Sequence, residues 1–133
     1  MKTSTKWKHD GIFESRQEGS GKSFTIDTER KEGPGPKSLL LSGLAGCSGI
    51  DIIEILKKQR VEFSDFSIDV EADTTEEHPK VFKDIFVVYT IRTEPSNEIK
   101  VKKAIELSLE KYCGVSAMLK KNSAIHYKLQ LIK

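Results

Sequence analysis

The chain has 133 residues, which is enough for one domain of ordinary size and too few for two. Hydrophobic residues make up 37% and charged residues 32%, a composition typical of a compact soluble domain and not of a disordered chain. The 22 Lys and Arg nearly balance the 20 Asp and Glu, which leaves a net charge of +2 and argues against non-specific nucleic-acid binding. We therefore expect a single domain over residues 1–133 with no nucleic-acid partner.

Targeting and metal-binding signals are also weak. No apolar run in the sequence approaches the roughly 18 residues that a membrane span needs. Residues 1–8 lack the hydrophobic region of a signal peptide. We therefore expect a cytoplasmic protein without membrane contact. His9, His78 and His126 are widely separated and do not have metal-ligand spacing, so no zinc site is expected.

The first thirty residues predict three short strands, at 3–9, 12–17 and 23–28. Asp10-Gly11, between the first two, is a dipeptide typical of a type I′ hairpin turn. Residues 32–36 (Glu-Gly-Pro-Gly-Pro) combine flexible glycines with prolines that lack an N–H, so they predict a connector without regular structure.

The next segment has no charged residue from Ser38 to Ile50 and is apolar on every side, which predicts a long, buried central helix of about twenty residues. Gly43, Gly46 and Gly49 are three apart and therefore lie roughly on one stripe of this helix. Each glycine costs about 1 kcal/mol relative to alanine inside a helix. The stripe indicates either a backbone or ligand that comes very close to it, or simply tight packing between helices.

The remainder of the chain predicts two strands, two helices and a final strand. Residues 65–73 alternate between apolar and polar, whereas the strand expected at 81–93 is apolar on both faces near Phe86, which favours cover on both sides or a subunit interface. A helix that begins near Ser96 is interrupted at Cys113, and a short helix (115–121) and a strand (125–131) follow. This order predicts an α+β fold.

The two cysteines, Cys47 and Cys113, are too few for a disulfide scaffold. Cys47 has small neighbours in the central helix, and Cys113 lies close to the N-terminus of the next helix, where unpaired N–H groups stabilise a thiolate. Free cysteines are also common as inert packing residues. The residues alone leave both interpretations open.

Two motifs resemble those of the OsmC/Ohr family. Pro36–Lys58, with Gly-Cys-Ser around Cys47 and an aspartate at Asp51, resembles its central-helix motif, and Glu110–Ser116 resembles its second cysteine motif. The order of strands and helices agrees over nearly the whole chain. The resemblance implies an OsmC-like fold, an intertwined homodimer around the buried central helices, and no metal or haem cofactor.

The resemblance also implies thiol-dependent reduction of organic hydroperoxides. Cys47 would attack the peroxide O–O bond, and Cys113 would resolve the resulting sulfenic acid as a disulfide, which a dithiol of the lipoyl type would reduce. The residues suit this chemistry, because peroxide reduction needs a reactive thiolate and a second thiol within reach.

The sequence departs from the family pattern at three positions. The family places a glutamate early in the central helix, where it positions an arginine against the thiolate, but this chain has Lys37 and Ser38 there. The N-terminal region offers Arg16 and Arg30, of which Arg16 is the candidate. Gly114 follows the second cysteine where the family usually has proline. These differences bear on peroxidase efficiency and not on the fold.

Two other functions stay open. The first is a non-catalytic OsmC-like dimer that binds a small apolar ligand or senses oxidation, which Lys37 and Ser38 favour. The second is a hot-dog-type thioesterase that uses Asp51. A carboxylate near a thiol raises the pKa of that thiol, so we favour a structural role for Asp51, hydrogen-bonded at the dimer interface.

Overall fold

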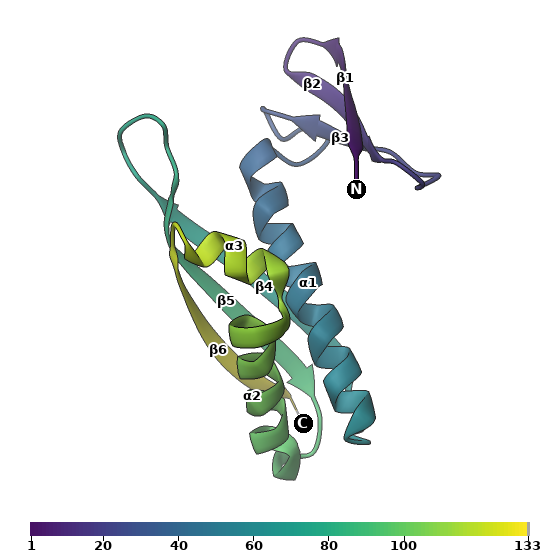
Figure 1. Cartoon of the computed structure of the whole chain (residues 1–133), viewed down its shortest axis with the longest axis vertical. Helices are drawn as coiled ribbons and strands as arrows, with labels where there is room; N and C mark the ends of the chain where they lie inside the picture. The colour runs from purple at the N-terminus through teal and green to yellow at the C-terminus, as the bar shows by residue number, and fades with distance from the viewer. Residues whose placement is uncertain (133) are drawn as a thin grey trace. The chain divides into compact units, whose positions relative to one another are not determined.

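The computed structural model describes residues 1–132, and the chain divides into two compact units, Met1–Leu40 and Leu41–Lys133. The elements follow the order that the sequence predicts (Figure 1). The fold is therefore α+β, as expected, while the assignment of the chain to a single domain stays a prediction.

The first unit contains an antiparallel three-stranded sheet in the order β1-β2-β3, made of β1 (Thr3–His9), β2 (Ile12–Gln17) and β3 (Phe24–Asp27). The hairpin between β1 and β2 forms where it was predicted. Asp10 has a positive φ of 49°, whereas Gly11 does not have a positive φ. A type I′ turn needs positive φ at both central residues, so this turn type was predicted wrongly.

The connector after β3 is organised by Asp27, whose side chain is buried. Its carboxylate accepts the backbone N–H groups of Glu29, Lys31 and Glu32 at 2.9–3.2 Å. These bonds, mainly those from Glu32 and Glu29, lower the pKa of Asp27. Gly33 passes so close to Thr25 that a Cβ atom would lie 2.2 Å from its carbonyl oxygen. The connector therefore has no regular structure and is nevertheless well fixed.

The second unit is built on a sheet in the order β4-β5-β6, with β4 (Ser64–Thr74), β5 (Phe82–Arg92) and β6 (Ala124–Ile132). The central strand β5 is antiparallel to β4 and parallel to β6. Parallel neighbours need a long crossover, and the chain provides it as the 3-10 turn Pro95–Asn97, α2 (Glu98–Leu107), a π-helical turn, η2 (Ser108–Tyr112), and α3 (Gly114–Lys120).

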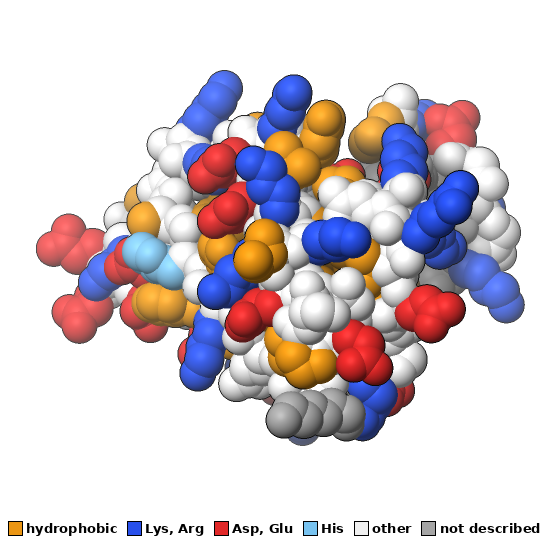
Figure 2. Space-filling view, turned by 90° about the horizontal axis from the view of Figure 1, so that it is seen from below, with side chains coloured by type: hydrophobic (Ala, Val, Ile, Leu, Met, Phe, Trp, Pro, Cys, Tyr) orange, Lys and Arg blue, Asp and Glu red, His pale blue; other side chains and the backbone are white. Residues whose placement is uncertain are grey.

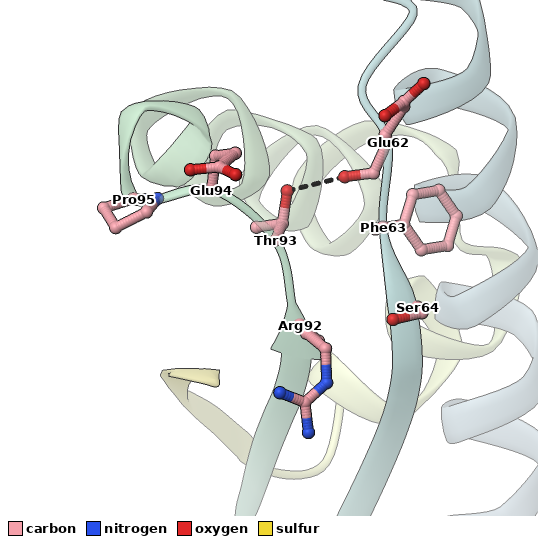
Figure 3. Close-up of a pocket in the computed structure, with 7 residues that line it drawn as sticks. All are labelled: Glu62, Phe63, Ser64, Arg92, Thr93, Glu94 and Pro95. Carbon is pink, nitrogen blue, oxygen red and sulfur yellow. Dashed lines mark hydrogen bonds between the residues drawn. The ribbon is translucent and has the colours of Figure 1, made fainter. Parts of the chain in front are cut away.

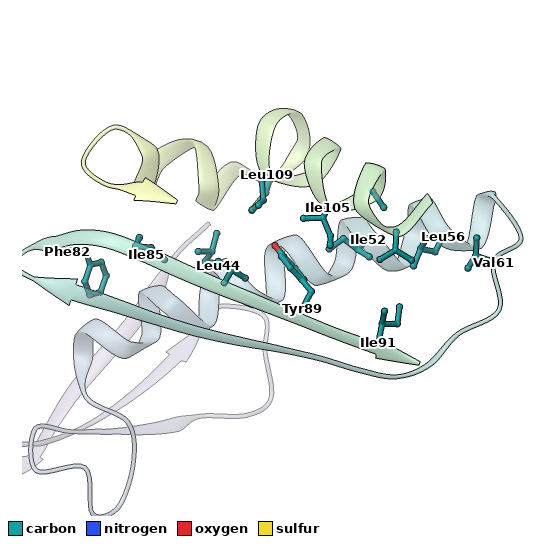
Figure 4. Packing of buried hydrophobic residues seen from close by; sticks show 14 residues of the cluster. Leu44, Ile52, Leu56, Val61, Phe82, Ile85, Tyr89, Ile91, Ile105 and Leu109 are labelled. Carbon is teal, nitrogen blue, oxygen red and sulfur yellow. The ribbon is translucent and has the colours of Figure 1, made fainter. Parts of the chain in front are cut away.

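The hydrophobic core lies between this sheet and the helices (Figure 4). The alternation of β5 sends Ile85, Val87, Tyr89 and Ile91 to the helical side, where all four are buried. They face the long helix α1 (Pro36–Lys58) and α2, whose buried apolar residues are Leu44, Ile52, Leu56, Val101, Ala104 and Ile105. The core therefore holds both cysteine-bearing segments against one strand.

Helix α1 has the predicted length, but it is not buried all round within the chain. Its buried residues include the i, i+4 row Leu44, Ser48, Ile52 and Leu56, whereas Ile50 is 61% exposed. A Cβ atom on Gly49 would lie 3.0 Å from Ile68, but one on Gly43 or Gly46 would have no neighbour within 4 Å. The prediction of all-round burial is therefore wrong for the single chain, because one side of α1 has no cover from it.

The outer face of the second sheet is partly apolar, as predicted. Phe86 is 37% exposed there and stacks on His126, with ring centroids 5.2 Å apart. The His126 ring in turn lies 2.9 Å from the Asp84 carboxylate. This outer face and the open side of α1 are therefore both apolar surfaces that the single chain leaves partly uncovered.

The expectation that no apolar segment is long enough to span a membrane also needs correction. Helix α1 is long and apolar enough to cross a membrane by length and composition. A core helix of a soluble protein passes the same test, and α1 packs one face into the core described above. On the surface shown in Figure 2, acidic and basic side chains are interspersed and do not gather by sign, in keeping with the small net charge.

Candidate functional site

Both cysteines lie in the second unit and are free thiols. Cys47 is on α1, is half-buried and packs against the core cluster. Cys113 belongs to that cluster and is 3% exposed. It lies at the end of the π-helical turn, where it is the N-cap of α3. The structure therefore presents one accessible thiol and one enclosed thiol.

The pKa of the Cys113 thiol is strongly raised. Burial, followed by a side-chain hydrogen bond with Cys47, raises the pKa of Cys113 to about 11. The N–H of Ser116, 3.3 Å from the Cys113 sulfur, acts in the opposite direction. The start of α3 thus donates to this sulfur as expected, but burial has the larger effect. Cys113 therefore stays protonated at neutral pH.

The π-helical turn places Cys113 at this position. The Cys113 N–H donates to the Ser108 carbonyl at 2.8 Å, a bond across five residues where an α-helix would span four. The Leu109 carbonyl accepts the Ser116 hydroxyl at 2.8 Å and the Lys120 ammonium. The turn is therefore tied both to the end of α2 and to α3.

A buried polar network, which the sequence analysis did not anticipate, lies beside the thiols. Ser48 Oγ on α1 lies 2.7 Å from the Tyr89 hydroxyl on β5 and 2.9 Å from Ser108 Oγ, and Ser108 Oγ is also 2.9 Å from Asp51 Oδ2. Ser48, Tyr89 and Ser108 are fully buried. One signal was present in the sequence: Ser48 interrupts the apolar row of Leu44, Ile52 and Leu56 at helical spacing.

Ser108 is the donor to α1 in this network. A serine hydroxyl has a single hydrogen, and a carboxylate oxygen only accepts. The Ser108 hydroxyl donates toward Asp51 Oδ2, Ser48 Oγ and, at 3.4 Å, the Ser48 carbonyl, so these acceptors share one hydrogen. Either hydroxyl of the Ser48–Tyr89 pair can donate to the other. Burial raises the pKa of Tyr89 to about 12, which keeps this hydroxyl protonated.

Asp51 is the carboxylate end of the network and thus has a structural hydrogen bond, as expected, but within its own chain. Its negative charge contributes to the raised pKa of Cys113 and of Tyr89, although burial is the main cause for both. Asp51 also lines a cavity of about 480 Å³, together with Lys58, Leu107 and Tyr112. The cavity adjoins the turn that carries Cys113, because Tyr112 precedes that residue.

Arg16 lies in the first unit, exposed on β2, where it lines a hollow of about 380 Å³ with Lys6 and Glu14. Its approach to Cys47 stays a prediction. Lys37 and Ser38 are exposed in the first turn of α1, which contains no acidic residue. The carboxylate that the family uses to hold an arginine is therefore not supplied by that turn.

A further cavity of about 500 Å³ lies where β4 begins and β5 ends (Figure 3). Its walls include Arg92 and Thr93, and the Thr93 hydroxyl donates to the Glu62 carbonyl at 2.7 Å. Neither cysteine lines it. Among residues 1–132, no group of three or more His, Cys, Asp or Glu side chains is placed to hold a metal ion. The thiol pair with its polar network is therefore the candidate site.

Comparison with known proteins agrees with this geometry. A family model described as OsmC-like protein matches residues 28–128, which include both cysteines. The chain belongs to the OsmC-like protein family. This family membership suggests a role related to peroxide reduction or to the stress response.

Individual relatives cover nearly the whole OsmC-like chain. Protein YhfA of Escherichia coli K12 is 29% identical over 133 residues, which are 99% of this chain and 98% of YhfA. The OsmC-like protein of Mycoplasma pneumoniae is 17% identical with a TM-score of 0.85, over 99% of this chain and 96% of that one. The organic hydroperoxide resistance protein OhrB of Bacillus subtilis is 19% identical with a TM-score of 0.65, over 97% and 96%. At these identities, the two structures show a shared fold.

The enclosed thiol of this OsmC-like protein gives a first prediction. At pH 8, a pKa of about 11 in place of 9.0 lowers the thiolate fraction of Cys113 roughly a hundredfold. Alkylation of Cys113 by iodoacetamide should be at least that much slower in the reduced native protein than in urea. Because a raised pKa favours the protonated form, the native rate should rise tenfold per pH unit and level off near pH 11. Peptide mass spectrometry would measure the alkylation rate of Cys113 against pH. Equal pH midpoints of this rate in native and unfolded protein would contradict the raised pKa.

Proposed function

We propose that the protein is a cytoplasmic, thiol-dependent peroxidase that reduces organic hydroperoxides through Cys47 and Cys113. The observation that carries the proposal is that two free thiols in unequal environments pack on the same core, where Cys47 contributes to the raised pKa of Cys113. The more accessible one, Cys47, is suited to meet a peroxide, and the enclosed one, Cys113, is suited to react only with its neighbour. Membership of the OsmC-like family supports the same chemistry.

The reaction has two oxidative steps. The Cys47 thiolate attacks one oxygen of the hydroperoxide, the O–O bond breaks, and the other oxygen leaves as an alcohol after taking a proton. Cys47 is then a sulfenic acid. The Cys113 sulfur attacks the Cys47 sulfur, a disulfide forms, and the displaced hydroxyl leaves as water with the proton that Cys113 carried. A dithiol of the lipoyl type then reduces the disulfide and is itself oxidised to a cyclic disulfide.

The raised pKa of Cys113 fits the first step, in which Cys47 alone reacts with the peroxide. A protonated Cys113 does not compete for the peroxide, because the thiolate is the nucleophile. Its proton is also available for the hydroxyl that leaves Cys47. Cys47 contributes to the raised pKa of Cys113, which supports two thiols close enough to form a disulfide after a local movement. Gly114, which has open space around the position of a Cβ atom, does not obstruct that movement.

We also infer that the protein is a homodimer whose two copies pack along the uncovered side of α1. That side includes Ile50, Gly43 and Gly46, none of which has cover from its own chain. Burial of apolar surface is the main driving force of association. A second copy would thereby provide the close contact that the glycine stripe predicts.

The thiol chemistry can be tested with cumene hydroperoxide and dihydrolipoamide. One equivalent of peroxide should produce an intramolecular disulfide between Cys47 and Cys113, detected by mass spectrometry. Cys47→Ser should abolish peroxide consumption. Cys113→Ser should consume one equivalent and retain a sulfenic acid on Cys47, which a dimedone probe traps. Catalytic turnover with the dithiol should need both cysteines.

The outcome also separates the alternatives. If both thiols stay unmodified in excess hydroperoxide, the enzyme proposal fails and a ligand-binding dimer replaces it. If a disulfide forms but the dithiol does not reduce it, the protein senses oxidation and does not turn over. Hydrolysis of an acyl thioester that is lost in Asp51→Asn but kept in Cys47→Ser would instead support the thioesterase hypothesis.

Arg16 is proposed to provide the positive charge that activates Cys47. In the Cys113→Ser background, Arg16→Gln should slow sulfenic acid formation at pH 7 at least tenfold, because a nearby cation favours the thiolate. The rate should recover as the pH rises. Arg30→Gln is the matched control, since Arg30 is also exposed in the first unit and should leave the rate within twofold. Equal effects of both substitutions would remove Arg16 from the site.

The homodimer is tested by Gly46→Val. Within one chain nothing lies near the added side chain, so a monomer would tolerate the change. A dimer packed on α1 would be overpacked, at a cost of about 1–3 kcal/mol. Sedimentation should give about twice the chain mass of 15.0 kDa for the parent and weaker association for Gly46→Val. Lys58→Val, at the exposed end of α1, should have no such effect. A stable folded 15 kDa parent at micromolar concentration would refute the homodimer.

A further inference from the structure

We propose that Ser108 is a positioning residue that holds the two thiols in register for disulfide formation. This assignment deepens the proposed function, since it concerns the same thiol pair. Ser108 bonds to the segment of Cys47 through its side chain and to Cys113 through its backbone. A single residue therefore connects the two segments, with its side chain bonded to one and its backbone bonded to the other.

The connection runs through three short links. Ser48 is covalently bonded to Cys47 in α1 and lies 2.9 Å from Ser108 through the two hydroxyl oxygens. Ser108 also donates to Asp51 Oδ2, one turn further along α1, at 2.9 Å. Its carbonyl accepts the Cys113 N–H at 2.8 Å. Two contacts on one helix fix both the position and the rotation of the π-helical turn.

The backbone link follows from the π-helical turn. In an ordinary α-helix the Ser108 carbonyl would accept the N–H four residues on, which belongs to Tyr112. Here it accepts the N–H of Cys113 instead. A displacement of Ser108 relative to α1 is therefore transmitted directly to the residue that bears the second sulfur. π-Helical turns are frequently found at functional sites.

The position of Ser108 matters because disulfide formation has strict geometric demands. A disulfide needs Cα atoms that are usually 4.4–6.8 Å apart and sulfurs that meet at about 2.05 Å, so small errors in register reduce the stability of the bond. A merely structural serine would affect the stability of the fold. A positioning serine would in addition change how readily the two thiols pair, which is a separate measurable quantity.

Pairing is measured without peroxide in buffers of reduced and oxidised glutathione. One glutathione disulfide oxidises the two protein thiols to their disulfide and becomes two reduced glutathione molecules, so the equilibrium constant is the effective concentration of the thiols. Ser108→Ala should lower this concentration at least tenfold, which raises the reduction potential by about 30 mV. With cumene hydroperoxide, the variant should form sulfenic acid on Cys47 at the parent rate and close the disulfide more slowly.

Two controls separate position from stability. Ser123→Ala removes a buried hydroxyl that donates to the Phe82 carbonyl at 3.1 Å, away from the network, and should leave the effective concentration within twofold of the parent. Asp51→Ala removes the carboxylate that accepts the Ser108 hydroxyl and should lower the effective concentration as Ser108→Ala does. Asp51→Asn keeps an accepting oxygen and should restore most of the loss. Because Asp51 is only half-buried, these variants decide the question even where Ser108→Ala does not fold.

The results distinguish this inference from the proposed function. Unchanged effective concentration in both Ser108→Ala and Asp51→Ala would overturn the positioning role, whether or not the protein reduces peroxides. An equal loss in Ser123→Ala would overturn it too. A tenfold loss that is confined to Ser108 and Asp51 would support it even if the parent protein fails to consume any hydroperoxide, in which case only the enzyme proposal would fall.

Discussion

The hydrogen bond between Ser48 and Ser108 determines how the second unit fits together. Both hydroxyls are fully buried, and a buried hydroxyl without a partner costs about 1–3 kcal/mol. An apolar contact at this position would tolerate sliding of one helix past the other, because apolar packing is not directional. Hydrogen bonds at 2.9 Å to Ser48 and Asp51 do not. The register of the π-helical turn against α1, and with it the spacing of the thiols, therefore follows from this polar junction.

The same enclosure makes the two thiols chemically unequal. Cys113 is surrounded by core residues, so its ionised form is disfavoured even though a helix N-terminus donates to the sulfur. Cys47 lies one residue before the buried Ser48, on the border between the core and the uncovered side of α1. The two cysteines thus acquire different environments from the way in which α1 and the π-helical turn pack in the core. This asymmetry fits a first thiol that meets an oxidant and a second that reacts only with the first.

The sequence predicted the elements well, because its signals were local. Alternation marked β4 and β5, the connector showed its glycines and prolines, and the uncharged run from Ser38 to Ile50 marked α1. The polar network was not predicted, because Ser108 and Tyr89 are both far from Ser48 in sequence. Their pairing with Ser48 depends on the packing of β5 and the crossover against α1. The π-helical turn was read as an ordinary helix end. Its extra residue depends on which carbonyl Cys113 reaches, which the helical pattern does not encode.

The error about burial of α1 has a physical origin that bears on the site. Apolar periodicity reports which side chains are to be removed from water, but not whether the same chain or another one removes them. The row of Leu44, Ile52 and Leu56 is covered by its own sheet and α2, whereas Gly46 and Ile50 face away from them. Cys47 lies between Gly46 and Ser48, so whatever covers the open side of α1 also shapes the approach to its sulfur. Cover of the open side of α1 and access to the first thiol are therefore linked through a single helix.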